Sequence, residues 1–190
     1  MTALPDSTPT HVPPPPYTPR PTSTAAPDIE ALLAHMTLEE KLGQVMVIGF
    51  DGLEPETELL EMIRTYHVGG VILFARNVDS PRQVAELTNA LQRVALESGH
   101  PGLLIAIDQE GGRVARLTKN KGFTEFPGAM AIAATGDVEN ARRVAQALAV
   151  EMRAVGINTD FAPDLDVNNN PANPVIGIRS FGSDPARVAA

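Results

Sequence analysis

Two acidic and two basic side chains follow a short apolar run near the middle of the chain. Residues 103–107 (Leu-Leu-Ile-Ala-Ile) have the length and branching of a buried β-strand. The charged residues come directly after it: Asp108, Glu110, Arg113 and Arg116. In parallel α/β folds the carboxyl ends of the strands form the edge where ligands bind. Carboxylates and guanidinium groups there predict a site for a polyhydroxylated ligand, because charged partners strengthen hydrogen bonds to hydroxyl groups.

Two roles are open for the acidic pair in this segment. Asp108 and Glu110 lie two residues apart, so on an extended strand their side chains would share a face, as a catalytic acid pair requires. We favour the interpretation in which Asp108 holds the ligand. Glu110 is then a buried structural partner of Arg113 or of nearby backbone amides.

One further group contains possible metal ligands. Asp160, Asp164 and Asp166 offer the oxygen atoms that Mg²⁺ or Ca²⁺ prefer, but the interpretation we favour is a loop of capping and turn acids. His67 lies near the predicted end of a helix, and His100 lies in a Gly-His-Pro turn. We expect both histidines to be structural or solvent-facing, and the sequence predicts no metal site.

Composition excludes several classes of protein. The chain has 190 residues, of which 43 % are hydrophobic, a formal net charge of −8 and no cysteine. The negative charge argues against a nucleic-acid partner. The lack of cysteine excludes disulfides, thiolate catalysis and cysteine-bound metals. No apolar run approaches the roughly 20 residues of a membrane span. The N-terminus has no apolar core of a signal peptide, so we expect a cytoplasmic protein.

The sequence divides into a leader and a foldable part. Residues 1–27 are rich in Pro, Thr and Ser, a composition typical of a disordered leader with polyproline character. Helix and strand patterns alternate over residues 28–190. Helices are predicted over 28–36, from Thr37, over 55–66, from 79 and over 137–155, and strands over 45–50, 71–74, 103–107 and 157–161. Residues 184–190 have the pattern of the opening of another helix.

This alternation predicts an α/β fold with a parallel sheet and right-handed crossovers. An open doubly wound sheet and a (β/α)₈ barrel both satisfy it. No G-x-G-x-x-G follows the first strand, and polar residues follow every strand, Arg76 among them as a possible rim residue. Both features favour the barrel, whose site is shared among all βα loops. A complete barrel needs about 250 residues, so we predict the first four βα units of a TIM barrel, truncated.

Several ordered motifs resemble glycoside hydrolase family 3, and within it the β-N-acetylhexosaminidase branch. The segments that carry the resemblance span the foldable part: 39–44 (EEKLGQ), 68–74 (VGGVILF), 107–114 (IDQEGGRV), 161–163 (FAP) with Asp166-Val167, and 173–181 (NPVIGIRSF). Asp164 departs from the pattern, since an apolar residue is usual at that position.

The resemblance implies a retaining (β/α)₈-barrel hydrolase that uses no cofactor and removes terminal β-linked N-acetylglucosamine from substrates such as muropeptides. Carried over position by position, Asp108 accepts hydrogen bonds from sugar hydroxyls, and Arg116 and Arg179 donate to the same sugar. We therefore expect these three side chains to converge.

The resemblance also implies that this chain lacks the catalytic residues. The family takes its nucleophilic aspartate from the second half of the barrel, and in this branch the acid/base is a histidine in an Asp-x-His loop that follows a Lys-His motif. None of the four histidines, His11, His35, His67 and His100, has an aspartate two residues before it or a lysine directly before it. We expect the 190-residue chain alone to be inactive. The alternative is a non-catalytic sugar-binding or scaffolding half-barrel.

Overall fold

The computed structural model describes residues 28–190, which divide into two units at His35 and Met36. In the first unit the described residues form helix α1 (Ile29–His35), whose first turn is capped by Asp28: its Oδ1 accepts the backbone N–H of Ala31 at 3.1 Å. The predicted leader, residues 1–27, lies outside the described residues. The second unit, residues 36–190, contains all the elements that follow.

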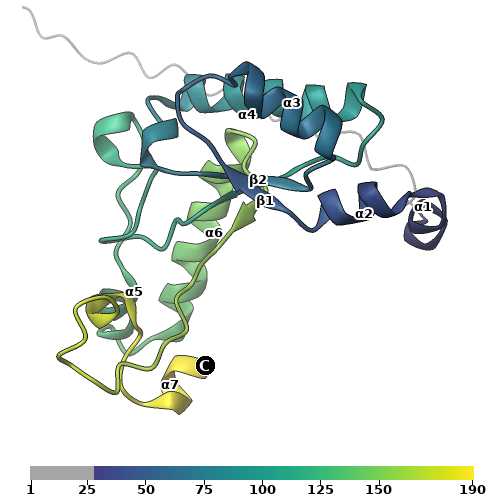
Figure 1. Ribbon diagram of the computed structural model, residues 1–190. Coiled ribbons are helices and arrows are strands. Elements are labelled where there is room, and N and C mark those ends of the chain that lie inside the picture. The colour runs from purple at the N-terminus through teal and green to yellow at the C-terminus, as the bar shows by residue number, and fades with distance from the viewer. Residues whose placement is uncertain (1–27) are drawn as a thin grey trace, which may run out of the picture. The chain divides into compact units, whose positions relative to one another are not determined.

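The second unit alternates helices and strands much as predicted (Figure 1). In chain order its elements are α2 (Leu38–Gln44), β1 (Val47–Gly49), α3 (Thr57–Tyr66), β2 (Gly70–Leu73), η1 (Ala75–Asn77), α4 (Pro81–Glu97), β3 (Leu104–Ile107), η2 (Lys119–Lys121), α5 (Ala129–Ala133), α6 (Val138–Ala154), β4 (Thr159–Asp160), η3 (Gly177–Arg179) and α7 (Pro185–Ala189). Strands β1 and β4 are shorter than predicted, and α5 and the three 3₁₀ turns were not predicted. Helix α7 confirms the predicted helix opening.

The helices begin where the sequence offers side-chain caps. Helix α2 begins after Thr37, as predicted, and Thr37 and Glu40 form its capping box: the Thr37 hydroxyl accepts the Glu40 N–H at 3.2 Å, and the Glu40 carboxylate accepts the Thr37 N–H at 2.7 Å. Ser80 caps α4, with Pro81 in the first turn, and Asp137 caps α6. Such caps satisfy N–H groups that have no partner within the helix.

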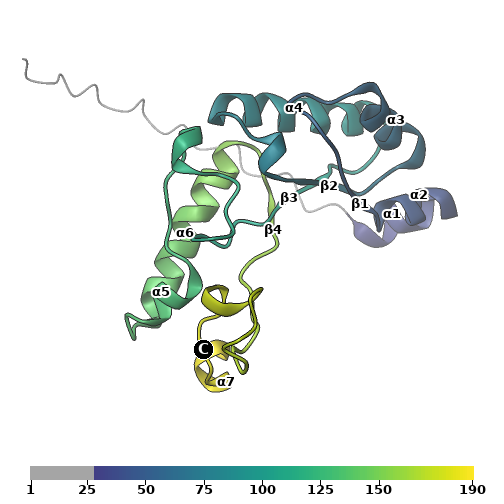
Figure 2. The same ribbon diagram turned by 60° about the vertical axis from the view of Figure 1, so that its left-hand side comes forward.

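The four strands form one parallel sheet in the order β1-β2-β3-β4. Val71 lies opposite Ile105, and Leu73 opposite Ile107. Consecutive strands are neighbours throughout, whereas a doubly wound sheet reverses its strand order. Helices α3, α4 and α6, which connect successive strands, therefore lie along the same side of the sheet (Figure 2). This is the arrangement of a barrel wall, and it confirms the predicted α/β fold class.

The core lies between the sheet and these helices. Val71, Leu73, Ile105 and Ile107 are fully buried, and they share one cluster with residues of the connecting helices: Leu59, Ile63, Val84, Leu87, Leu91, Leu148 and Met152. Burying one such side chain contributes about 1.5–3 kcal/mol to folding. Leu104 alternates with Ile105 along β3 and is 50 % exposed, so the face of the sheet away from the helices is only partly covered.

None of the helices within residues 28–190 is both long enough and apolar enough to span a lipid bilayer.

Candidate functional site

The first ion pair of the candidate site forms where β3 ends. The Arg116 guanidinium donates from Nη2 to Asp108 Oδ2 at 2.9 Å, and both side chains are about a quarter exposed. Arg116 Nε is buried and has no hydrogen-bond partner within residues 28–190. Asp108 and Arg116 thus meet, as the sequence predicted, and a polar ligand can reach both of them.

Gln109 fixes the segment that carries Arg116. Its side chain is buried, its Oε1 accepts the backbone N–H of Arg116 at 2.8 Å and of Leu117 at 3.0 Å, and its Nε2 donates to the Leu117 carbonyl at 3.0 Å. Its own N–H donates to Asp160 Oδ1 at 3.0 Å, which joins the ends of β3 and β4. Sequence reasoning missed this residue, although a glutamine between two acids at the end of a buried strand is a usable signal.

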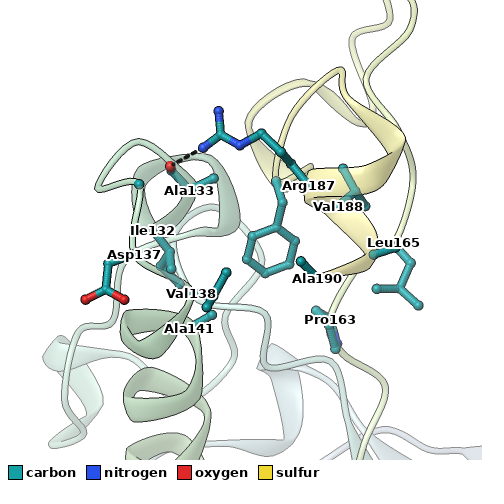
Figure 3. A pocket seen from close by; sticks show the side chains of 13 residues that line it. Ile132, Ala133, Asp137, Val138, Ala141, Pro163, Leu165, Arg187, Val188 and Ala190 are labelled. Carbon is teal, nitrogen blue, oxygen red and sulfur yellow. Dashed lines mark hydrogen bonds between the residues drawn. The ribbon is translucent and has the colours of Figure 1, made fainter.

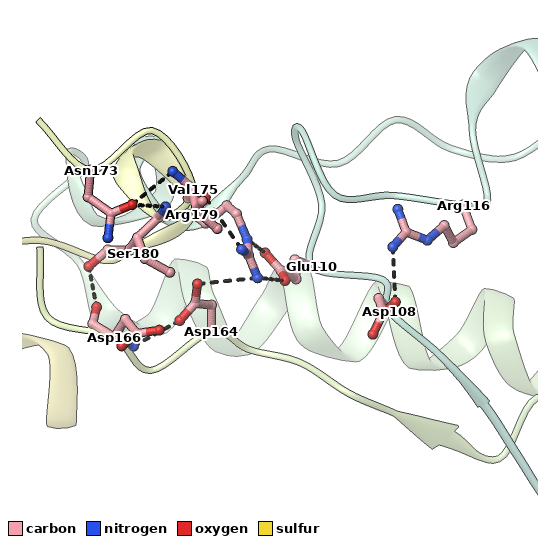
Figure 4. A network of polar contacts seen from close by, with 10 residues as sticks. Asp108, Glu110, Arg116, Asp164, Asp166, Asn173, Val175, Arg179 and Ser180 are labelled. Carbon is pink, nitrogen blue, oxygen red and sulfur yellow. Dashed lines mark hydrogen bonds and ion pairs between the residues drawn. The ribbon is translucent and has the colours of Figure 1, made fainter. Parts of the chain in front are cut away.

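Arg179 forms a second ion pair, with Glu110 (Figure 4). The guanidinium donates from Nη2 to Glu110 Oε1 at 2.7 Å and from Nε to Glu110 Oε2 at 2.9 Å. Asp164 Oδ2 lies 3.4 Å from the same Nη2. Hydrogen bonding to Glu110 raises the pKa of Arg179, so the arginine remains charged. The sequence predicted Arg113 or backbone amides as the partner of Glu110, which was wrong: Arg179 occupies both oxygens.

The turn after Glu110 depends on two glycines. Gly111 and Gly112 have φ values of 82° and 57°, a region that side chains disfavour. The Glu110 N–H donates to the Val114 carbonyl at 2.9 Å, which closes the turn. A Cβ on Gly111 would lie 2.5 Å from the Pro127 carbonyl oxygen. The backbone at Gly111 therefore lies so close to Pro127 that a residue with a side chain would not fit at this position.

Hydrogen bonds within residues 164–182 position Arg179. The Ser180 side chain is fully buried, and its hydroxyl donates to the Asp166 carbonyl at 2.5 Å and accepts the Gly182 N–H at 3.1 Å. Asn173 Oδ1 accepts the Val175 N–H at 2.9 Å, which shapes the preceding turn. Sequence reasoning missed Ser180, because a lone serine in a long loop gives no local signal.

Of the three aspartates considered as a metal site, Asp160 contacts Gln109, whereas Asp164 and Asp166 contact each other. Asp160 accepts from Gln109, and Asp164 Oδ1 accepts the Asp166 N–H at 2.9 Å as a turn acid does. Burial raises the pKa of Asp160, and the nearby charges of Asp108 and Glu110 act in the same direction. Hydrogen bonding and repulsion from Asp164 raise the pKa of Asp166. Within residues 28–190 these three carboxylates do not come together as a group of possible metal ligands.

Polar residues also gather where β1 and β2 end. Arg76 donates from Nε to the Phe50 carbonyl at 3.0 Å and pairs with Asp51 at 2.5 Å. Asn77 is fully buried and donates to the Phe50 and Gly52 carbonyls at 3.1 and 2.8 Å. Arg76 thus lies at the same edge of the sheet as Asp108, the place that a rim residue requires.

Several cavities lie along this end of the second unit. One of about 340 Å³ is lined by Glu110 and Arg179, and one of about 410 Å³ by Glu110 and Asp160. A third of about 370 Å³ lies between α5, α6 and α7, with Ile132, Val138 and Leu165 in its wall (Figure 3). Of these three cavities, the first is lined by a predicted sugar-binding residue, Arg179. We therefore place the candidate site at this cavity and at the neighbouring Asp108–Arg116 pair, which lines none of the three.

Residues 37–190 match the N-terminal domain of glycosyl hydrolase family 3. The chain belongs to this family. Beta-hexosaminidase A of Pseudoalteromonas piscicida is 51 % identical over 136 residues, which make up 69 % of this chain and 22 % of the relative. Beta-hexosaminidase LpqI of Mycobacterium tuberculosis is 38 % identical over 173 residues, 90 % of this chain and 42 % of the relative.

A solved structure of this family matches the fold as well. The family 3 β-N-acetylglucosaminidase of Paenibacillus sp. FPU-7 superimposes with a TM-score of 0.78 and 51 % identity, over 81 % of this chain and 29 % of that protein. These matches confirm the predicted family and its β-hexosaminidase branch. This chain spans between about a fifth and two fifths of the length of these relatives.

The three residues predicted to bind the sugar thus belong to two ion pairs. Asp108 and Arg116 contact each other, and Arg179 contacts Glu110, whose position is two residues from Asp108. Figure 4 shows both pairs beside the loop that follows β3. Convergence of all three on one sugar remains a prediction.

Proposed function

We propose that this chain is the N-terminal part of the catalytic barrel of a retaining β-N-acetylhexosaminidase, which hydrolyses terminal β-linked N-acetylglucosamine. In that protein Asp108, Arg116 and Arg179 bind the sugar, while the nucleophile and the acid/base come from the second half of the barrel. The reaction passes through a covalent glycosyl-enzyme and uses no cofactor.

The Asp108–Arg116 pair is the main support for this proposal. It lies at the carboxyl end of β3, where barrel enzymes bind their substrates, and both side chains are about a quarter exposed. Sugar hydroxyls can therefore reach this charged pair, and charged partners strengthen hydrogen bonds to hydroxyl groups. The β-N-acetylglucosaminidase of Paenibacillus sp. FPU-7, 51 % identical to this chain, supports N-acetylglucosamine as the sugar.

In this scheme the chain binds but does not transform its ligand. Retaining hydrolysis needs a carboxylate nucleophile and, about 5–5.5 Å from it, an acid/base, which the resemblance assigns to a histidine outside this chain. Asp108 and Glu110 are each held by an arginine. This arrangement suits binding and orientation of a polar ligand better than attack on a sugar carbon.

The nucleotide sequence beyond codon 190 provides a first test. The proposal expects a Lys-His and an Asp-x-His motif in the continuing frame. The polypeptide with that continuation should hydrolyse a chromogenic β-N-acetylglucosaminide, while the 190-residue chain should not. Turnover by the short chain, or a frame without both motifs, would contradict the proposal.

A non-catalytic sugar-binding half-barrel is the second candidate, favoured by one observation. The described residues already contain a continuous buried cluster and a paired four-stranded sheet. This candidate expects cooperative thermal unfolding of the 190-residue chain and a rise in its melting temperature with N-acetylglucosamine. Non-cooperative unfolding without a response to the sugar rules it out.

A further inference from the structure

Three metal-ligating side chains gather at the end of the sheet opposite to Asp108. Glu40 lies in α2, which precedes β1, His67 follows α3 and precedes β2, and His100 follows α4 and precedes β3. The strands are parallel, so the segments that enter them meet at one edge. This group is therefore separate from the candidate sugar site, where the strands end.

The distances within this group fit a bound metal ion. His67 Nδ1 lies 3.2 Å from His100 Nδ1 and 3.0 Å from its Nε2, and the two rings stand edge to face, with centroids 4.3 Å apart. One ligand atom from each of the three residues lies within 4.8 Å of the others. Ligand atoms about 2.0–2.2 Å from a tetrahedral Zn²⁺ are about 3.3–3.5 Å apart. The two imidazole nitrogens are already at nearly this spacing, and a carboxylate oxygen of Glu40 lies within 4.8 Å of them.

The backbone fixes His67 beneath α2. His67 ends α3 in the left-handed region, with φ 57°, and its carbonyl accepts Gln44 Nε2 at 2.9 Å. A Cβ on Gly43 would lie 2.6 Å from that carbonyl oxygen. Helix α2, which carries Glu40, therefore packs directly on the backbone of His67, and the two ligands are placed together by the fold.

Neighbouring groups orient the other two ligands. Glu40 Oε2 accepts the Thr37 N–H at 2.7 Å in the capping box, which leaves Oε1 available. His100 Nε2 lies 3.4 Å from the Arg64 carbonyl. An acceptor on one nitrogen of an imidazole is the usual outer partner of a metal-binding histidine, because it fixes the tautomer that presents the other nitrogen. With Nε2 so oriented, His100 offers Nδ1, the atom 3.2 Å from His67 Nδ1.

We propose that Glu40, His67 and His100 bind one divalent transition-metal ion, and that Zn²⁺ suits the site best. Two imidazole nitrogens and one carboxylate are ligands that Zn²⁺ takes readily, whereas Mg²⁺ and Ca²⁺ prefer oxygen alone. A water molecule completes the four-coordinate shell. The ion joins α2 to the segments that follow α3 and α4, so its role is structural: it clamps the amino-terminal edge of the sheet.

The competing arrangement is a direct N–H···N hydrogen bond between the two imidazoles. It needs no third residue and no ion, so it assigns Glu40 only to the helix cap. Replacing Glu40 by Gln separates the two arrangements, because Gln at this position preserves the capping box but is a poor metal ligand.

The test measures Zn²⁺ binding by the chelator-treated 190-residue chain, with ZnCl₂ as the only probe. Calorimetry should give about one ion per chain, and ZnCl₂ should raise the melting temperature. His67→Asn tolerates the left-handed backbone but offers no imidazole. This substitution, His100→Gln and Glu40→Gln should each weaken binding by more than about tenfold, the range over which metal sites respond to altered ligand shells.

Matched controls come from the same chain. Glu39→Gln changes the neighbouring carboxylate of α2, and His35→Ala removes a histidine outside the group, so both should bind Zn²⁺ like the original chain. Absence of Zn²⁺ binding by the original chain overturns the proposal, as does undiminished binding after His67→Asn. Undiminished binding after Glu40→Gln overturns the three-ligand site. Because these readouts require no sugar, they are independent of the proposed hydrolase function.

Discussion

Arg179 and Glu110, 69 residues apart in the sequence, form a two-pronged ion pair with N···O distances of 2.7 and 2.9 Å. Glu110 is 8 % exposed and Arg179 is 24 % exposed. The planar guanidinium matches the carboxylate in a way that lysine cannot. The pair therefore connects the long loop after β4 to the turn after β3. It also fixes the position of Arg179, one of the residues predicted to bind the sugar.

Removing the charge of Glu110 should destabilise the fold. Glu110→Gln leaves Arg179 with Asp164 as its remaining acidic neighbour, at 3.4 Å, so we expect a loss of about 1–3 kcal/mol in the free energy of unfolding. Urea denaturation measures this loss. Glu139→Gln is the control, because Glu139 pairs with Arg142 on the exposed face of α6, and such pairs contribute about 0–1 kcal/mol. Equal losses in the free energy of unfolding after the two substitutions would show that the buried pair does not stabilise the fold.

Most helices and strands could be predicted because the sequence signals that indicate them are local. Caps such as Thr37 with Glu40 mark where helices begin, and the apolar run 103–107 marks β3. Helix α5 has five residues and neither a side-chain cap nor a long apolar stripe, so its pattern could not distinguish it from a loop.

The site was less predictable because its contacts join distant segments. The partner of Glu110 was expected at Arg113, three residues away, but the polypeptide brings in Arg179 through β4 and the loop beyond it. The contact between His67 and His100 likewise spans 33 residues. A residue type at the end of a strand predicts which chemistry a site offers. It does not predict which of several arginines reaches it.

Asp108 should be required for sugar binding in the longer polypeptide. Asp108→Ala removes an acceptor for sugar hydroxyls and leaves Arg116 Nη2 without its 2.9 Å partner. We expect kcat/KM for a chromogenic β-N-acetylglucosaminide to fall by about 5- to 150-fold, which corresponds to about 1–3 kcal/mol. Asp79→Asn, an exposed acid before α4, is the control. Unchanged kinetic constants after Asp108→Ala would exclude Asp108 from the site.

Gln109 should contribute to sugar binding indirectly, by holding Arg116 in position. Gln109→Leu keeps the approximate volume of the side chain but removes three hydrogen bonds to residues 116 and 117, so the segment loses its anchor. We expect KM to rise while kcat changes little, together with a loss of stability of about 1–3 kcal/mol. In a double-mutant cycle, Gln109→Leu and Arg116→Ala should be non-additive.

Gln92→Leu separates this positioning role from general destabilisation. Gln92 also clamps a backbone segment, since its Nε2 donates to the Leu103 carbonyl at 2.8 Å and its Oε1 accepts the Leu103 N–H at 2.9 Å. Leu103 immediately precedes β3, at the end of the strand away from the candidate site. This variant should lose comparable stability and keep the original KM. A similar rise in KM in both variants would show that Gln109 acts only through the fold.

Asp160 should give the protein a characteristic pH dependence. Burial raises its pKa in the folded state, assisted by Asp108 and Glu110 and opposed by the Gln109 N–H. The folded state therefore binds the proton more tightly than the unfolded chain, whose Asp pKa is about 3.9. By linkage, this group's contribution to stability is full below that pH and is lost as the pH rises through the raised pKa.

Asp160→Asn should remove this loss, because the amide stays neutral and its oxygen still accepts the Gln109 N–H. The variant should be more stable than the original chain at pH 7, and the difference should shrink toward about pH 4. Melting temperatures measured from pH 4 to pH 8 record both curves. Asp184→Asn is the control, since Asp184 is an exposed acid that also accepts a backbone N–H, from Ala186 at 2.9 Å, and its curve should follow that of the original chain. Parallel curves for Asp160→Asn and the original chain would mean that Asp160 binds its proton equally in the folded and unfolded states.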